Sequence, residues 1–184
     1  DRRQRQMCIR DSLDSFLLHQ FSDLLHPEGN RLLEWLKSLK ERGLVKRIGV
    51  SIYSESDLDR IPLHDFQIVQ LPLSLYDQRL IQNGTIRNLN KKGIAIHVRS
   101  IFLQGLILNP SSEWPEFFSP EFITHHKKMD IEIQKKGISN LEIALEFVKS
   151  CKNIEAVVFG VTSLEELIDI YKIWNKSTHN NELI

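Results

Sequence analysis

The sequence has little cysteine, no excess of either charge and no long apolar run. Its 24 Lys and Arg residues balance 24 Asp and Glu residues, so the formal net charge is zero. A protein without excess positive charge does not attract polyanions strongly, so nucleic acid and anionic membranes are disfavoured as partners. No apolar stretch approaches the ~20 residues that a bilayer-spanning helix requires, and no secretory signal opens the chain. We therefore expect a cytoplasmic protein.

Cysteine redox chemistry and metal catalysis are also disfavoured. The two cysteines, Cys8 and Cys151, are too few for a disulfide framework or a paired metal motif. Cys151 lies on an apolar helical face, where a small buried thiol is the ordinary interpretation. His125 and His126 are adjacent on a predicted helix, so their rings point in different directions, and no carboxylate motif accompanies them. We expect no metal site.

Glycine-rich phosphate motifs are missing as well, although the chain alternates between strands and helices. Short apolar runs followed by segments of helical period are typical of βαβ units and a parallel sheet. An open, doubly wound sheet would normally show GxGxxG or GxxxxGK[ST] after its first strand, and neither occurs. A complete (β/α)8 barrel takes roughly 250 residues. The pattern therefore predicts an α/β fold, a partial (β/α)8 barrel of about five units with parallel strands and outer helices.

The five units begin at Leu13. The expected strands are 13–19, 44–53, 66–74, 93–102 and 154–160. The expected helices cover about 30–43, 54–61, 78–92 and 163–175, with a further helix starting near 139 and an extra amphipathic stretch at 119–136. Asn30, Ser54 and Ser163 are predicted helix caps, and Asp57 and Glu166 complete capping boxes with the two serines.

Residues 1–12 differ from the rest of the chain. They are polar and basic without period, and they run into the first strand without turn chemistry. Residues 7–12 can be encoded by a sequence that resembles the adapter of transposon-based sequencing libraries. We expect 1–12 to be non-native and 13–184 to form one portion of a barrel. The alternative is a native helix that leads into the strand.

Polar residues close the predicted strands, where barrel enzymes keep their chemistry. These residues are His19, Ser51, Gln70, Arg99, Ser100, Gly160, Thr162 and Ser163. Each is a weak signal alone, since a histidine at a strand end is more often structural than catalytic. Ser163 and Glu166 can be fully occupied in capping their helix. Helix N-termini after the last two barrel strands nevertheless commonly receive a phosphate, and both interpretations stay open.

An aromatic loop follows the fourth predicted strand. Residues 109–118 carry Pro110, Trp114, Pro115, Phe117 and Phe118. Because this segment is a βα loop of the predicted barrel, its aromatic side chains are a candidate substrate wall. Packing of the same rings onto the barrel rim is an equally good explanation.

Taken in order, five blocks resemble a known family. LLHQFSDL (17–24), LKERGLVKRIGVSIYSESDLDRI (39–61), IVQLPLSLYDQR (68–79), NKKGIAIHVRSIFLQGLI (90–107) and VVFGVTSLEELIDI (157–170) resemble the aldo-keto reductases from barrel strand four to strand eight, with wording closest to bacterial members. The resemblance implies reduction of aldehydes or ketones with NADPH or NADH, and a small-molecule carbonyl substrate. It also implies the C-terminal part of the barrel, without its N-terminal strands.

The resemblance assigns a role to each strand-end residue. His19 matches the histidine that hydrogen-bonds the substrate carbonyl, and Ser51 and Gln70 match residues that hold the nicotinamide carboxamide. Arg99 stands where the family often stacks an aromatic ring on the nicotinamide. Ser100 matches a pyrophosphate contact. The adenosine-phosphate end is matched by Gly160, Thr162, Ser163 and Glu166.

The sequence departs from the family's pattern at three places, and it has no match for the family's general-acid tyrosine. Arg99 replaces the stacking ring, Ile52 replaces an asparagine that helps grip the carboxamide, and Glu165 and Glu166 stand where NADPH-preferring members often have a cation. Carboxylates repel a 2′-phosphate, which tilts the expectation slightly towards NADH. The family's general-acid tyrosine, with its lysine and aspartate, matches no position, because Tyr53, Tyr76 and Tyr171 lie in other blocks.

Two other functions remain open at this stage. A non-catalytic nicotinamide-binding regulatory module would need the same cofactor residues without the tyrosine. Another (β/α)8 enzyme could bind a sugar phosphate near its last two strands. We expect the 184 residues by themselves to be inactive as a reductase.

Overall fold

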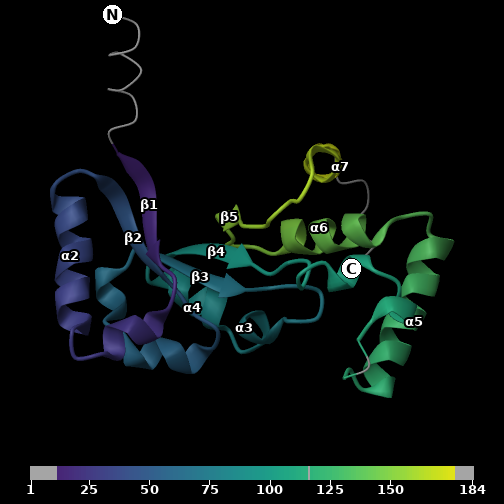
Figure 1. Cartoon of the computed structure of the whole chain (residues 1–184), viewed down its shortest axis with the longest axis horizontal. Helices are drawn as coiled ribbons and strands as arrows, with labels where there is room; N and C mark the ends of the chain where they lie inside the picture. The colour runs from purple at the N-terminus through teal and green to yellow at the C-terminus, as the bar shows by residue number, and fades with distance from the viewer. Residues whose placement is uncertain (1–11, 116, 177–184) are drawn as a thin grey trace, which may run out of the picture. The chain divides into compact units, whose positions relative to one another are not determined.

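The computed structural model describes residues 12–115 and 117–176. The predicted non-native segment, apart from Ser12, and Cys8 lie outside the described residues. Five strands form one sheet in the order of the sequence (Figure 1). They are β1 (Leu13–Leu18), β2 (Val45–Ser51), β3 (Ile68–Pro72), β4 (Ala95–Arg99) and β5 (Ala156–Val157). The pairs β1–β2 and β2–β3 are parallel, as predicted.

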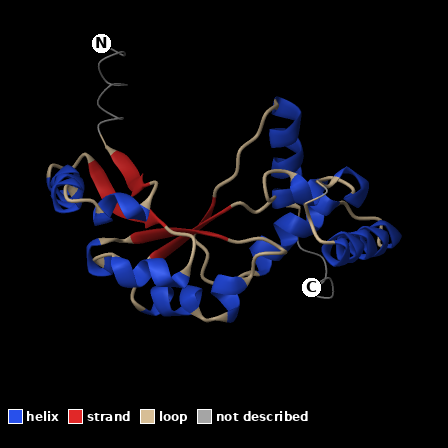
Figure 2. Ribbon diagram, turned by 60° about the horizontal axis from the view of Figure 1, so that its bottom comes forward, coloured by secondary structure: helices blue, strands red, loops and turns tan. Residues whose placement is uncertain are grey.

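Helices separate the strands along the chain (Figure 2). The α-helices are α2 (Gly29–Glu41), α3 (Arg79–Gln82), α4 (Thr85–Lys91), α5 (Pro120–Lys135), α6 (Asn140–Ser150) and α7 (Leu164–Asn175). Short 3-10 helices cover Phe21–Leu25, Glu55–Arg60, Leu63–Asp65, Leu106–Leu108 and Ser111–Glu113. Among the described residues, no helix is both long and apolar enough to cross a membrane.

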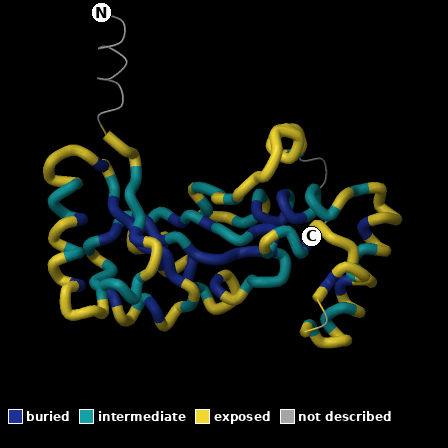
Figure 3. The backbone as a smooth tube through the Cα atoms, viewed as in Figure 1, coloured by how far each residue is buried: buried dark blue, intermediate teal, exposed yellow. Residues whose placement is uncertain are grey.

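The described chain divides into two compact units. The first, called the sheet unit, comprises residues 12–72, 79–98 and 153–156. The second, called the helical unit, comprises 73–78, 99–115, 117–152 and 157–176. Each unit has its own buried residues, whose backbone is coloured dark blue in Figure 3.

The core of the sheet unit is built on the central strands. Ile48 and Val50 of β2 and Val69 and Leu71 of β3 are buried, and so is Ile68 on the opposite face of β3, so both faces of these strands are largely covered. Helix α2 packs beside β2 and buries Leu36 completely. The apolar spacing that predicted this helix is therefore the spacing that holds it to the sheet.

Some predicted boundaries of the sheet unit are wrong. Asn30 is not a cap, because α2 begins one residue earlier at Gly29, whose missing Cβ would lie 2.0 Å from the carbonyl oxygen of Leu24. The continuous helix expected over 78–92 is two helices, because Gly84 adopts a left-handed φ of 81° between them. The capping box of Ser54 and Asp57 is confirmed, although the helix it opens is a 3-10 helix.

The fifth predicted strand is also shorter than expected. Only two of the seven residues in 154–160 belong to β5, and pairing begins with a hydrogen bond of 2.9 Å from the Glu155 amide to the Ile96 carbonyl. Beyond Val157 the apolar residues leave the strand, because Phe159 packs against Phe102 at a ring distance of 6.0 Å. An apolar run alone could not show where the pairing ends.

Three capped helices organise the helical unit. The hydroxyls of Ser119, Ser139 and Ser163 accept hydrogen bonds from the third residue of α5, α6 and α7, respectively. Helix α6 supplies much of the core through Leu145, Phe147 and Val148. Cys151, at its end, is only partly buried. Burial raises the pKa of its thiol, which donates to the Phe147 carbonyl at 3.2 Å.

Candidate functional site

Three predicted site residues lie side by side on neighbouring strands of the sheet unit, although Gln70 lies in the middle of β3 (Ile68–Pro72) and not at its end as predicted. Ser51, the last residue of β2, is the register partner of Gln70 in β3, so both side chains point to the same face of the sheet. His19 follows β1 directly, one residue beyond the Leu18–Val50 pair. Ser51 is buried, Gln70 is half-buried and His19 is exposed. The sheet therefore presents a hydroxyl, a carboxamide and an imidazole along one edge.

Ile52 continues the backbone of β2 beyond Ser51. Its amide donates to the Gln70 carbonyl at 2.9 Å, and its side chain is fully buried. The isoleucine side chain has no group that can hydrogen-bond to a ligand. Side-chain hydrogen bonds to a ligand at this edge can therefore come only from Ser51 and Gln70 among these three residues.

A separate cavity of about 810 Å³ lies within the helical unit. It is lined by the segment that follows β4 and by the segment that joins β5 to α7. Of the cofactor-binding residues predicted from the sequence, Ser100, Gly160, Thr162 and Glu166 line it. Arg99 and Ser163 do not. Arg99 instead donates from Nη1 to the Ser100 hydroxyl at 3.3 Å.

The first of these segments carries unusual backbone geometry that the sequence did not reveal. Ser100, Leu103 and Gln104 adopt positive φ values of 62°, 48° and 58°, and Gly105 follows with 88°. Left-handed conformations of non-glycine residues cost energy and gather at ligand sites. Ser100 and Gln104 both line the cavity. Only Gly105 could have signalled such a turn in the sequence.

Ser163 caps α7 as predicted, but Glu166 closes back on Thr162 rather than on the amide of Ser163, so the predicted capping box is only half formed. Glu166 accepts from the Thr162 amide at 2.6 Å and from the Thr162 hydroxyl at 3.0 Å, and its own amide donates to Ser163 Oγ at 3.2 Å. The Thr162 hydrogen bonds lower the pKa of the Glu166 carboxyl below its ordinary value. Glu166 is therefore an ionised wall of the cavity as well as part of the cap.

The aromatic side chains of residues 109–118 were expected either to line a substrate site or to pack the loop, and different residues do each. Trp114 is buried, stacks on His126 at 4.1 Å, and donates from Nε1 to the Leu106 carbonyl at 3.0 Å. Phe117 is 82% exposed, and together with Phe118 it lines a second hollow of about 660 Å³. Trp114 thus packs the loop in place, while Phe117 and Phe118 line the hollow.

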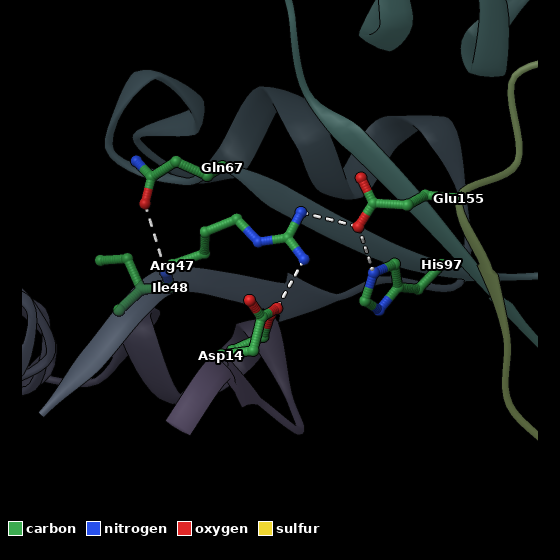
Figure 4. Close-up of polar contacts among 7 residues, drawn as sticks. Asp14, Arg47, Ile48, Gln67, His97 and Glu155 are labelled. Carbon is green, nitrogen blue, oxygen red and sulfur yellow. Dashed lines mark hydrogen bonds and ion pairs between the residues drawn. The ribbon is translucent and has the colours of Figure 1, made fainter. Parts of the chain in front are cut away.

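A polar cluster in the sheet unit was missed by sequence reasoning (Figure 4). Arg47 lies between two carboxylates, 2.6 Å from Asp14 Oδ2 and 2.6 Å from Glu155 Oε1, and His97 Nε2 lies 3.2 Å from the same Glu155 oxygen. Arg47 and His97 each lie two residues after the start of their strands. In barrel enzymes this end of the strands serves stability rather than chemistry. The spacing of 108 residues between Arg47 and Glu155 left no local signal.

Comparison with known proteins decides the family. The model of the aldo/keto reductase family matches residues 2–183. The chain belongs to the aldo/keto reductase family. This result supersedes the alternative of an unrelated barrel enzyme that binds a sugar phosphate. No curated protein matches the sequence.

Solved aldo-keto reductases share the fold at low identity. The chain is similar to an aldo-keto reductase of Bacillus halodurans, with a TM-score of 0.72, 16% identity, and coverage of 97% of this chain and 61% of that one. It is also similar to the glycerol dehydrogenase of Gluconobacter oxydans, with a TM-score of 0.58, 20% identity, and coverage of 94% and 62%. The chain thus spans about three-fifths of these structures. The partial (β/α)8 fold is confirmed.

The cavity of the helical unit combines a left-handed backbone segment with an acidic lining. Glu165, Glu166 and Asp169 line it, and none of the described residues that line it is Lys or Arg. Carboxylates accept hydrogen bonds from hydroxyl groups and repel a phosphate. The side chains of this lining therefore provide acceptors for hydroxyl groups and no cation for a phosphate.

None of the described tyrosines of this aldo/keto reductase resembles an activated acid. Tyr76 donates its hydroxyl to His126 Nδ1 at 2.6 Å, and burial raises its pKa well above the ordinary value. Tyr53 and Tyr171 are exposed. A general acid needs a pKa near the working pH, so Tyr76 is unsuited to that role. The described residues also contain no group of three or more potential metal ligands.

Proposed function

We propose that this aldo/keto reductase chain binds NADH and contributes to the reduction of an aldehyde or ketone to an alcohol. The observation that carries the proposal is the cavity of the helical unit, where Ser100, Gly160, Thr162 and Glu166 meet beside a left-handed backbone segment. These residues come from two segments about sixty positions apart, and the resemblance had assigned all four to the same cofactor.

The sheet unit supports the other half of the proposal. Ser51 at the end of β2 and Gln70 in β3 are register partners, an arrangement that suits a single carboxamide group. His19, which directly follows the adjacent strand β1, is exposed and able to donate a hydrogen bond to a substrate carbonyl. When bound, the reduced nicotinamide supplies the hydride, and the protein's part is to orient the two reactants.

We propose further that NADH is preferred to NADPH. Three carboxylates line the cavity, and none of the described residues that line it is Lys or Arg. An added phosphate dianion would meet only repulsion from these side chains. Arg99 or Ser163 could take part only after a rearrangement, because neither lines the cavity.

Equilibrium binding tests the cofactor site directly. We would titrate residues 1–184 with NADH and NADPH and follow nicotinamide fluorescence, using Ser51→Ala and Thr162→Val as site variants. The exposed Lys135 of α5 provides a matched control, Lys135→Ala, outside the cavity. We expect NADH to bind more tightly than NADPH and both site variants to weaken binding. Absence of NADH binding by the folded chain would refute the proposal.

Turnover tests the expectation that residues 1–184 are inactive by themselves. The tyrosine, lysine and aspartate that the resemblance assigns to proton donation match no position of this sequence, so we expect residues 1–184 to bind NADH without oxidising it in the presence of simple aldehydes. Measured turnover would contradict this expectation. A non-catalytic nicotinamide-binding module stays the second candidate, because binding without turnover is also its signature.

A further inference from the structure

The sulfur of Met129 lies beside a hydroxyl that also contacts a buried histidine. Met129 is a half-buried residue of α5, and its Sδ lies 3.4 Å from the Tyr76 hydroxyl. The same hydroxyl lies 2.6 Å from Nδ1 of His126, whose side chain is fully buried. Two potential acceptors, a thioether and an imidazole nitrogen, therefore share one hydroxyl.

The imidazole is the better acceptor of the two. A tyrosine hydroxyl has a single hydrogen to donate, and a thioether sulfur accepts only weakly. Nε2 of His126 lies 3.0 Å from the Asn109 carbonyl, which only accepts, so Nδ1 is the acceptor of the neutral ring. The contact of Met129 with Tyr76 is then mainly packing of a sulfur against an aromatic residue.

The bond between Tyr76 and His126 connects three parts of the helical unit. Tyr76 lies in the segment after β3, and His126 lies in α5. The other ring nitrogen of His126 reaches Asn109 in the loop after β4 and lies 3.5 Å from Asp130 Oδ1. Trp114 of the same loop stacks on the imidazole at 4.1 Å. Loss of the Tyr76 bond would therefore weaken the packing of all three parts.

Oxidation of Met129 would reverse the order of the two acceptors. Hydrogen peroxide transfers one oxygen atom to Sδ, the sulfur gives up two electrons, and the peroxide is reduced to water. The product is a polar sulfoxide whose oxygen accepts hydrogen bonds well. Because the sulfur lies 3.4 Å from the Tyr76 hydroxyl, the new oxygen is within reach of its hydrogen. Nδ1 of His126 would then be a buried acceptor without a donor.

Met129 is also a better target for a peroxide than the described thiol. Peroxides oxidise the thiolate form of cysteine, and burial raises the pKa of the Cys151 thiol, so little thiolate is present at neutral pH. Oxidation of a thioether requires no ionisation. A half-buried methionine therefore stays reactive where the thiol does not.

We propose that Met129 is an oxidative modification site, at which the sulfoxide formed by a peroxide takes the hydroxyl of Tyr76 away from His126. Methionine sulfoxide reductases reverse this oxidation, so the site is a redox switch for the packing of the helical unit. The proposal is independent of the proposed function, because none of these three residues lines the cofactor cavity.

Peroxide treatment of residues 1–184 tests the proposal. Trypsin places Met129 in the peptide 129–135 and Met7 in the peptide 6–10, so mass spectrometry distinguishes the two methionines. We expect one added oxygen on 129–135 and about a tenfold rise in the ratio of unfolded to folded protein in urea, as for one buried acceptor that loses its donor. Methionine sulfoxide reductase should restore both. An unmodified Met129 beside an oxidised Met7, or a modified Met129 with unchanged unfolding, would overturn the proposal.

Two variants assign the effect to the Tyr76 hydroxyl. Met129→Leu keeps the volume and removes the sulfur, so peroxide should no longer change its unfolding. Met7, Cys8 and Cys151 remain in this variant, and a persisting effect would trace the loss to one of them and refute the site. Tyr76→Phe keeps Met129 but has no hydroxyl, so its oxidised and reduced forms should unfold at the same urea concentration. An equal loss in Tyr76→Phe and in the natural sequence would contradict the exchange of partners.

The hydrogen bond can also be followed without a variant. In a sample with isotope-labelled histidine, the Nδ1 resonance of His126 should shift when Met129 is oxidised. His64, whose side chain is 83% exposed, is the control and should not respond. An unchanged His126 resonance in the fully oxidised protein would show that the bond to Tyr76 survives, which overturns the proposal.

Discussion

The hydroxyl of Tyr76 lies 2.6 Å from Nδ1 of His126, a side chain fully removed from solvent. The other ring nitrogen of His126 lies 3.0 Å from the Asn109 carbonyl, which can only accept. Nε2 therefore donates to this carbonyl, and Nδ1 is bonded to the Tyr76 hydroxyl, which also lies 3.4 Å from Met129 Sδ. Two segments of the helical unit are joined through the ring of His126.

Removing the Tyr76 hydroxyl should therefore destabilise the protein. Tyr76→Phe leaves a buried acceptor without its donor, which costs about 1–3 kcal/mol of the free energy of unfolding. Urea unfolding measures this change. Tyr171→Phe removes the hydroxyl of a tyrosine that is 68% exposed, and should cost little. Equal losses in the two variants would show that the Tyr76–His126 bond contributes nothing.

Alkaline pH should destabilise the protein through the same residue. Burial raises the pKa of Tyr76 above its ordinary value of 10.0, so the fold favours the neutral hydroxyl. This contribution is complete below the ordinary pKa and is lost as the pH rises through the raised value. We expect the free energy of unfolding to fall above about pH 10 in the natural sequence and to fall less in Tyr76→Phe. Parallel pH profiles would contradict this assignment.

Two glycines should respond to alanine in opposite ways. A Cβ on Gly49 would lie 2.7 Å from the Ile68 carbonyl oxygen and 2.9 Å from Leu17 Cγ, so Gly49→Ala should cost about 1–3 kcal/mol of stability. A Cβ on Gly160 meets nothing within 4 Å, but Gly160 lines the proposed cofactor cavity. Gly160→Ala should leave thermal stability unchanged and weaken NADH binding. A loss of stability in Gly160→Ala would show that its surroundings are tighter than described.

Acid should weaken the Arg47 cluster. The hydrogen bond from Arg47 lowers the pKa of Glu155 below its ordinary value of 4.5. The resulting stabilisation is present above pH 4.5 and is lost as the pH falls through the lowered pKa. Arg47→Met should lower the melting temperature slightly at neutral pH, because partly exposed ion pairs contribute little. The difference between the two proteins should shrink towards pH 3 and in high salt.

Arg87→Met is the matched control for this cluster. Arg87 is an exposed residue of α4, so its substitution should leave the pH profile of the melting temperature unchanged. If Arg47→Met and Arg87→Met gave the same profile, the ion pairs of Asp14 and Glu155 with Arg47 would have no measurable role in stability.

Much of the candidate site could be predicted because it depends on local chemistry. Ser163 caps α7 through the Glu166 amide three positions on, as predicted. Ser51 ends β2 as predicted, whereas Gln70, expected to close its strand, lies in the middle of β3. Positions of this kind are encoded within a few residues, so the sequence is sufficient to find them. Their roles in binding a cofactor stay predictions.

Other features depend on contacts between distant residues. The continuous helix expected over 78–92 broke at Gly84, and the fifth strand retained two paired residues because Phe159 turns towards Phe102. Secondary-structure propensity is judged over a short stretch of sequence, so it does not include contacts with distant residues that override the local pattern.

The amino-acid sequence by itself determined the order of strands and helices and the serine caps Ser54 and Ser163, because each follows from hydrogen bonding and apolar spacing within one or two turns. Only the tertiary structure decided the left-handed backbone at Ser100 and Gln104, the cavity they line, and the Arg47 cluster. Positive φ at non-glycine residues is tolerated only where surrounding packing compensates for it. That compensation comes from residues far away in the chain.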